Sequence, residues 1–139
     1  MTSIIKVDQI QNTSGTTGLT IDGSGDVTFS GANTVTPVDS GWITPTLNSP
    51  YSNYGGPYGP VKYRKVGVIV NIQGLISNAS QGVVFTLPAG FRPDRQVVFF
   101  PVVANGGDAR FDVRQNGDVF IDTTPTSSWF SFACTFFTD

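Results

Sequence analysis

The sequence is rich in residues that favour β-strands and poor in residues that favour helices. It contains sixteen Val, sixteen Thr and nine Ile, but only four Leu, six Ala, three Lys and no Glu. β-Branched residues fit a pleated sheet, whereas Leu, Ala, Lys and Glu are common helix formers. Sixteen Gly and nine Pro separate short apolar runs. This usage predicts an all-β sandwich or barrel, and we expect an antiparallel, jelly-roll-like β-sandwich.

The composition changes near Thr36 and divides the chain into an N-terminal arm, residues 1–36, and a body, residues 37–139. The arm is rich in Gly, Ser, Thr and Asn, and its short strand-like stretches flank a "DGSGD" turn. An isolated hairpin is marginal in water, so we expect the arm to pair with other chains; the alternative is that it adds edge strands to its own domain. Six apolar side chains would make the contacts: Ile5, Val7, Leu19, Ile21, Val27 and Phe29.

The body opens with a Gly- and Pro-rich loop up to Pro60, and strand-like runs follow it. "RQVVFFPVVA" is apolar on both faces, which predicts either a central strand covered on both sides or a strand at a subunit interface. Two other runs each predict one buried face. Their buried residues would be Val66, Val68, Val70, Ile72 and Ile76 in the first, and Val83, Phe85 and Leu87 in the second.

The segment "ARFDVRQNGDVFID" predicts a hairpin whose register can be argued. A three-residue loop of residues 115–117 brings Val113 opposite Val119 and Phe111 opposite Ile121, which keeps one apolar face. It also puts Gly117 at the left-handed position that such a loop requires. The remaining charges would then form pairs on the solvent face: Arg114 with Asp118, and Arg110 with Asp122.

The residue types present argue against catalysis. The sequence has no His and no Glu, which excludes Ser-His-Asp triads, His-rich metal sites and a Glu-based glycosidase pair. Cys134 alternates with Phe residues in "WFSFACTFF" and is interpreted as a small core residue. Turn chemistry and surface ion pairs account for the Asp residues better than a calcium site does. We therefore expect no enzyme, no cofactor and no metal.

Charge and hydropathy exclude two classes of partner. The net charge is −2 without a long run of either sign, so no nucleic-acid footprint is present. The N-terminus lacks the pattern of a signal peptide, and no window approaches the length of a membrane span. A single cysteine cannot form an internal disulfide. We expect a soluble, unprocessed chain.

An ordered series of blocks resembles a known family. "YRKVGVIVNIQG", "FTLPAGFRPDR", "ARFDVRQNGDV" and "SWFSF", within residues 41–137, look like the C-terminal β-domain of tailed-bacteriophage virion surface proteins, including tail fibres and spikes. "SIIKVDQIQNTSG" is similar to the opening of phage structural proteins. The resemblance implies a non-enzymatic homotrimer that is made in the host cytoplasm and displayed on the virion surface.

Two functions are compatible with that resemblance. In the first, the protein is a capsid decoration, or cement, protein whose arms pair with the major capsid protein. In the second, it is a short tail fibre or spike that joins tail proteins and binds a host-surface glycan or protein. The tyrosines of the body loop, Tyr51, Tyr54, Tyr58 and Tyr63, would then be adhesive, or they pack on a sheet end. A fibre normally needs a long shaft, so 139 residues favour decoration.

Overall fold

The structure, a computed structural model, describes residues 9–11, 14, 17–29, 38–104, 106–123 and 129–138. The chain divides into two compact units, Met1–Thr36 and Pro37–Asp139. Within the described ranges the regular elements are antiparallel β-strands and one short 3-10 helix, η1 (Gly56–Tyr58). The all-β prediction is confirmed. None of the described segments forms a helix with the length and apolarity to cross a membrane.

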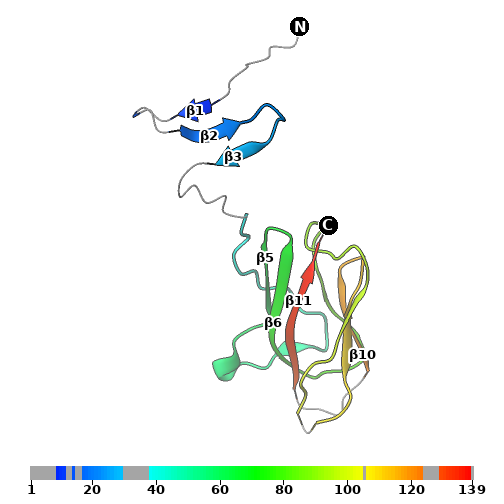
Figure 1. Cartoon of the computed structure of the whole chain (residues 1–139). Coiled ribbons are helices and arrows are strands. Elements are labelled where there is room, and N and C mark those ends of the chain that lie inside the picture. Colours follow the sequence, from blue (N-terminus) through cyan, green and yellow to red (C-terminus); the bar gives the residue numbers. More distant parts are fainter. Residues whose placement is uncertain are drawn as a thin grey trace. The chain divides into compact units, whose positions relative to one another are not determined.

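The N-terminal unit contains one small antiparallel sheet (Figure 1). Its strands, in spatial order, are β1 (Gln9–Gln11), β2 (Thr17–Ile21) and β3 (Val27–Phe29). Because Leu19 is opposite Phe29 and Ile21 is opposite Val27, the apolar positions of β2 and β3 share a register.

The turn between β2 and β3 is held by Asp22. Its Oδ1 accepts hydrogen bonds from the backbone N–H groups of Ser24, at 2.8 Å, and Asp26, at 2.9 Å. An Asp side chain that caps its own turn in this way is ordinary turn chemistry. The hydrogen bonds between Asp22 and the backbone therefore explain why the "DGSGD" stretch forms this turn.

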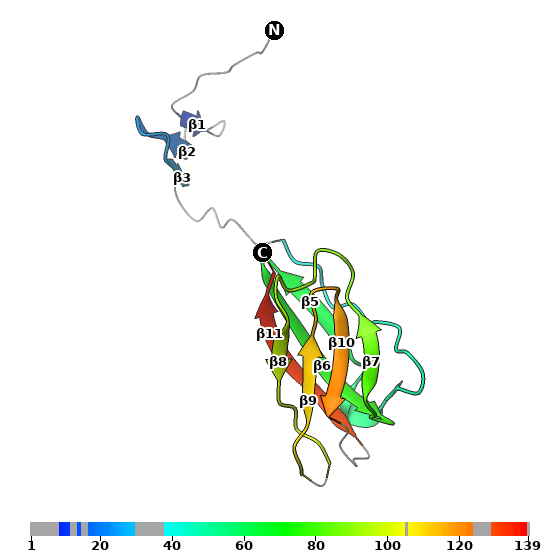
Figure 2. The same ribbon diagram turned by 90° about the vertical axis from the view of Figure 1, so that its right-hand side faces the viewer.

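The body consists of two antiparallel sheets packed face to face. Figure 2 shows one sheet with its strands side by side and the other sheet behind it. The strands of the first sheet, in spatial order, are β7 (Gly82–Thr86), β10 (Asp118–Thr123), β9 (Arg110–Val113) and β8 (Val97–Phe99). The second sheet contains β11 (Phe130–Phe137), β6 (Ile69–Ser77), β5 (Lys62–Val66) and β4 (Ser52–Asn53). In this sheet, β11, β5 and β4 all pair with β6.

The long strand β6 organises the second sheet. Along one edge it pairs with β11 over eight residues. Along the other edge it pairs first with β5, through residues 69–73, and then with β4, through residues 76 and 77. Two bridges, Asp39 to Val66 and Ile43 to Tyr63, extend this sheet beyond β5. Residues 39–43 therefore lie along the outer edge of β5.

Phenylalanine rings join the two sheets. Phe132 of β11 packs edge to face on Phe85 of β7, with 6.3 Å between ring centroids, and on Phe111 of β9, at 5.0 Å. Phe130 packs on Phe111 at 5.9 Å. The prediction for the last strand is confirmed, because Phe130, Phe132, Cys134 and Phe136 are all buried.

The β9–β10 hairpin has the predicted register. Val113 is opposite Val119, Phe111 is opposite Ile121, and Gly117 has a φ of 94°. A Cβ at Gly117 would lie 2.7 Å from Arg92 Nε and would also meet the Leu87 carbonyl oxygen. This position therefore needs glycine both for its backbone conformation and for its close neighbours.

The charges around the hairpin differ from the expected surface pairs. Arg110 does lie 3.4 Å from Asp122, but it also holds Asp112, which is only 1% exposed. The Arg114 guanidinium stacks over the Phe120 ring at 3.6 Å, so only backbone groups link Arg114 to Asp118. The predicted pair of Arg110 with Asp122 is therefore confirmed, whereas the predicted side-chain pair of Arg114 with Asp118 is wrong. Asp112, which belonged to neither predicted pair, is buried because Arg110 and Gln96 supply enough donors for its carboxylate.

Two of the predicted strand faces are also corrected. The run from Val66 to Ile76 is two strands, because Gly67, with a φ of 59°, and Val68 form a turn between β5 and β6. Val68 consequently lies on the surface. In β7 an irregularity in the pairing with β10 buries Val84 together with Phe85 and leaves Val83 half-buried. An extra residue in one strand shifts the alternation in this way.

Candidate functional site

One lateral side of the sandwich is open. β8 is the last strand of its sheet, and β11 is the last strand of the other. Among the described residues, residues 102–104 cover the start of the outer edge of β11, through the bridge of Val103 to Phe130 and the hydrogen bond from Ser131 N to the Val102 carbonyl. The rest of that edge and the outer edge of β8 pair with no described strand. The central-strand alternative for "RQVVFFPVVA" is therefore excluded.

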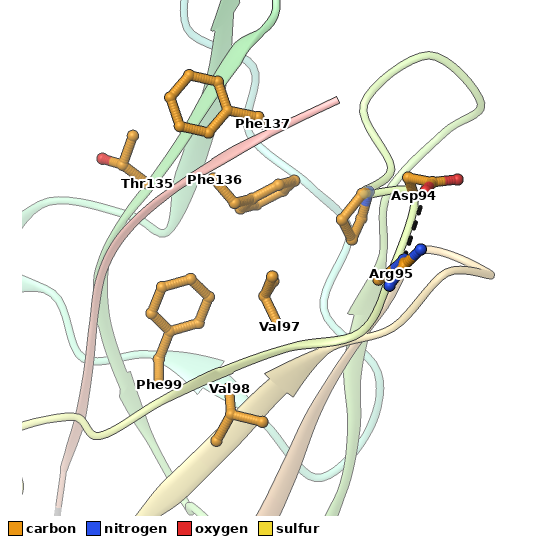
Figure 3. A pocket seen from close by; sticks show the side chains of 9 residues that line it. Asp94, Arg95, Val97, Val98, Phe99, Thr135, Phe136 and Phe137 are labelled. Carbon is orange, nitrogen blue, oxygen red and sulfur yellow. Dashed lines mark ion pairs between the residues drawn. The ribbon is translucent and has the colours of Figure 1, made fainter. Parts of the chain in front are cut away.

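A groove of about 610 Å³ lies between β8 and β11. Figure 3 shows Val97 and Phe99 extending from β8 toward Phe136 of β11. Asp94 and Arg95 form a 3.9 Å ion pair at one end. The full lining is Pro93, Asp94, Arg95, Val97, Val98, Phe99, Thr135, Phe136 and Phe137. A groove of this composition suits the apolar side chains of another polypeptide better than a charged small molecule.

Exposed apolar side chains occur in β8, in the residues that follow it and in β11. Phe100 is 82% exposed, and Val98, Val102 and Phe137 are also exposed. Val98, Phe100 and Val102 alternate along the chain, because Val97 and Phe99 face the core. We call these four exposed residues the apolar edge. Exposed apolar side chains beside an open strand edge are typical of protein–protein contacts.

A second surface lies on the outer face of the β5–β6–β11 sheet. Trp42, in the segment that bridges to β5, is 43% exposed. Lys62 Nζ lies 4.9 Å and Arg64 Cζ 5.8 Å from the centroid of its ring. Both distances are in the range of cation–π attraction. We call Trp42, Lys62, Arg64 and Asp39 the tryptophan platform.

Asp39 fixes the position of Arg64. The guanidinium donates from Nε to Asp39 Oδ1 at 2.8 Å and from its terminal nitrogen to Oδ2. The hydrogen bonds from Arg64, and then one from the backbone N–H of Gly41, lower the pKa of Asp39 to about 2. The carboxylate therefore stays ionised at every physiological pH and holds the guanidinium in a planar, bidentate ion pair.

The remaining predicted site residues lie in different places. Tyr51 and Tyr63 are buried, and Tyr51 donates to the Ser80 carbonyl at 3.1 Å. Tyr54 and Tyr58 are exposed and pack edge to face at 5.8 Å. Two of the four tyrosines therefore remain available at the surface of this chain.

The arm residues are only partly described. Ile5 and Val7 lie outside the described residues. Leu19 and Ile21 are half-buried, and Val27 is exposed. The Phe29 backbone pairs with Leu19. The contact of this unit with another chain stays a prediction.

Cys134 lies in the core. Burial raises the pKa of its thiol to about 12, despite a hydrogen bond from the Ile72 backbone that lowers it. The thiol is therefore protonated at neutral pH, and a protonated thiol is a poor nucleophile.

Sequence reasoning did not identify the tryptophan platform. The signal was present in "GW" and "VKYRK", because Lys62 and Arg64 alternate with Val61 and Tyr63, which are buried. Alternation puts both cations on one face of a strand, but only the bridges of residues 39–43 bring Trp42 beside them.

No family model matches the sequence, and no curated protein matches it. Among solved structures, the chain is similar to the receptor binding protein (gp15) of Listeria phage PSA, with a TM-score of 0.64. The match covers 75% of this chain and 67% of that chain at 14% sequence identity. At that identity the similarity shows that the two proteins share a fold.

Proposed function

We propose that this chain is a non-catalytic bacteriophage virion protein whose body binds a receptor on the host surface, as a short tail fibre or spike. The observation that carries the proposal is the fold shared with a phage receptor binding protein over three quarters of the chain. The ordered sequence blocks of residues 41–137, which resemble phage virion β-domains, support the same interpretation independently.

Receptor binding replaces capsid decoration as the leading hypothesis. The fold is similar to that of a phage receptor binding protein, and this similarity gives no support to a cement role. Chain length favoured decoration, but length is a weaker argument than a shared architecture. Fold similarity still does not fix function, so the proposal depends on a binding test.

The proposal includes self-association as a homotrimer. Support comes from the apolar edge, which one protomer leaves in contact with water. A closed three-fold ring would cover such a surface without open-ended assembly. The N-terminal unit would attach the trimer to another virion protein by strand pairing, as its short strands suggest.

The test is binding of the N-terminally labelled full chain to intact host cells. Saturable binding that unlabelled protein competes away is the expected result. Binding to undecorated capsid shells, together with no binding to cells, would contradict the proposal. The number of copies per particle gives a second measurement, because a dozen or fewer fits a tail fibre and hundreds fit a shell protein.

A further inference from the structure

We propose that the tryptophan platform binds a sugar that carries a phosphate or carboxylate group. The inference rests on the proposed function and names the chemical class of the receptor. It assigns to Trp42, Lys62 and Arg64 the contacts with that sugar.

The aromatic part of the platform is held in place and partly exposed. Trp42 lies between the bridges that tie Asp39 and Ile43 to β5, so its backbone is anchored on both sides. The indole is also in contact with the cations of Lys62 and Arg64. Trp42 is 43% exposed, and the exposed part of its indole is an apolar surface on which the C–H groups of a sugar ring can stack.

The charge of the platform favours an anion. Asp39 neutralises the charge of Arg64 through a bidentate ion pair. The described contacts of Lys62 include no carboxylate, and its ammonium lies against the Trp42 ring. The platform therefore has two cations for one anion, and its uncompensated positive charge lies 4.9 Å from the ring centroid. An acidic group on a stacked sugar would lie beside Lys62.

Polar side chains continue the surface across the sheet. Arg64 is opposite Asn71, and Asn71 is opposite Thr135, so these side chains share the outer face. Thr135 Oγ1 donates to Asn71 Oδ1 at 2.8 Å. That bond orients the amide and leaves its N–H groups without a partner among the described residues. Gln73, opposite Lys62, is exposed on the same face. Hydroxyl groups of a sugar need such donors and acceptors.

The other two surfaces lack this combination. The groove between β8 and β11 is lined mostly by apolar side chains, and its Arg95 is already beside Asp94. Tyr54 and Tyr58 pack against each other, and no cation is described against either ring. The tryptophan platform alone, among the described surfaces, joins an exposed aromatic ring, an uncompensated cation and an oriented amide.

The test uses tryptophan fluorescence of the full chain. In a Trp129→Phe background the emission reports Trp42 alone. Glucose 6-phosphate and glucuronate should each change that emission in a saturable manner, and glucose should bind at least about tenfold more weakly, because it lacks the charge for Lys62. Equal affinity for glucose and glucuronate, or for inorganic phosphate and glucose 6-phosphate, would overturn the inference.

Variants locate the site. Lys62→Gln should weaken binding of both acidic sugars at least about tenfold, whereas Arg114→Gln, which removes a charge that lies over Phe120 in the other sheet, should leave it unchanged. Equal loss in both variants would overturn the assignment to the platform. Trp42→Ala is then compared with the wild type on host cells. Cell binding unaffected by Trp42→Ala would overturn the inference and leave the proposed function standing. Acidic-sugar binding by a protein that binds no cells would contradict the proposed function instead.

Discussion

The body and the N-terminal unit are built from similar short antiparallel strands, yet among the described residues only those of the body form an interior. In the body, two sheets face each other and bury Phe85, Phe111, Phe130 and Phe132 almost completely. In the N-terminal unit, none of the described side chains of residues 9–29 is buried. A single sheet leaves its faces in water, so the second sheet of the body accounts for the difference in burial between the two units. We therefore propose that the small sheet gains stability from contacts outside itself.

The largest effect should come from the interior of the body. Phe132→Ala should lower the free energy of unfolding by about 3–5 kcal/mol, because it leaves a cavity among three aromatic neighbours. Ile21→Ala in the N-terminal sheet should cost less than about 1 kcal/mol, because that side chain is only half-buried. Denaturant titration of the two variants gives the comparison. Equal losses would mean that the N-terminal sheet shares the core.

Removal of a buried charge in the body should give the next largest loss of stability. Asp112→Ala should cost about 2–3 kcal/mol, because it removes a carboxylate that accepts from Gln96 Nε2 at 2.7 Å and from Arg110. Asp122 is the matched control, since it is partly exposed and lies 3.4 Å from the same Arg110. Asp122→Ala should change stability by less than about 1 kcal/mol. An Asp112 variant as stable as the Asp122 variant would show that the carboxylate is not buried.

Two glycines extend the comparison to turns. Gly117→Val should destabilise the body by about 1 kcal/mol or more, because its φ of 94° and its close neighbours exclude a branched side chain. Gly23, in the turn between β2 and β3, is open to solvent, and a Cβ there would meet nothing within 4 Å beyond its chain neighbours. Gly23→Ala should therefore leave the melting temperature unchanged. A Gly117→Val protein with a wild-type melting temperature would contradict the hairpin loop.

The smallest effect concerns the pH dependence of the stability that the Asp39–Arg64 ion pair of the tryptophan platform contributes. The pKa of Asp39 is lowered from 3.8 to about 2, so its ion pair contributes stability above pH 3.8 and loses it as the pH falls toward 2. The difference in melting temperature between the wild type and Asp39→Asn should be small, constant above about pH 5, and mostly lost near pH 2. A difference that already declines between about pH 7 and pH 5 would show that Arg64 does not hold this carboxylate.

Much of the body could be predicted from local pattern, because alternation and turn chemistry act over a few residues. The alternating apolar residues from Phe130 to Phe136 predict the last strand, and a loop that ends at Gly117 predicts the register of the β9–β10 hairpin. The turn at Gly67 was missed, because it lies inside an unbroken apolar run and no polar residue marks it. Alternation likewise cannot reveal an irregular pairing such as that of β7.

The platform and the buried Asp112 could not be predicted for a different reason. Trp42 meets Lys62 and Arg64, and Gln96 meets Asp112, only after strands that are distant in sequence have paired. The tyrosines show the reverse: their shared loop suggested a common role, but the fold buries Tyr51 and Tyr63 and exposes the other two. Contacts between distant residues decide such sites, and no short-range pattern encodes them.

The central claim is that the body binds the host while the N-terminal unit binds the virion. It is tested most directly by co-sedimentation of the full chain and of residues 37–139 with host cells, and with phage particles that lack the protein. We predict that residues 37–139 fold, still bind cells, and no longer bind the particles, because the body has its own core and the small sheet supplies the strands for pairing. Undiminished binding of residues 37–139 to the particles, or folded protein that has lost its binding to cells, would contradict this division of roles.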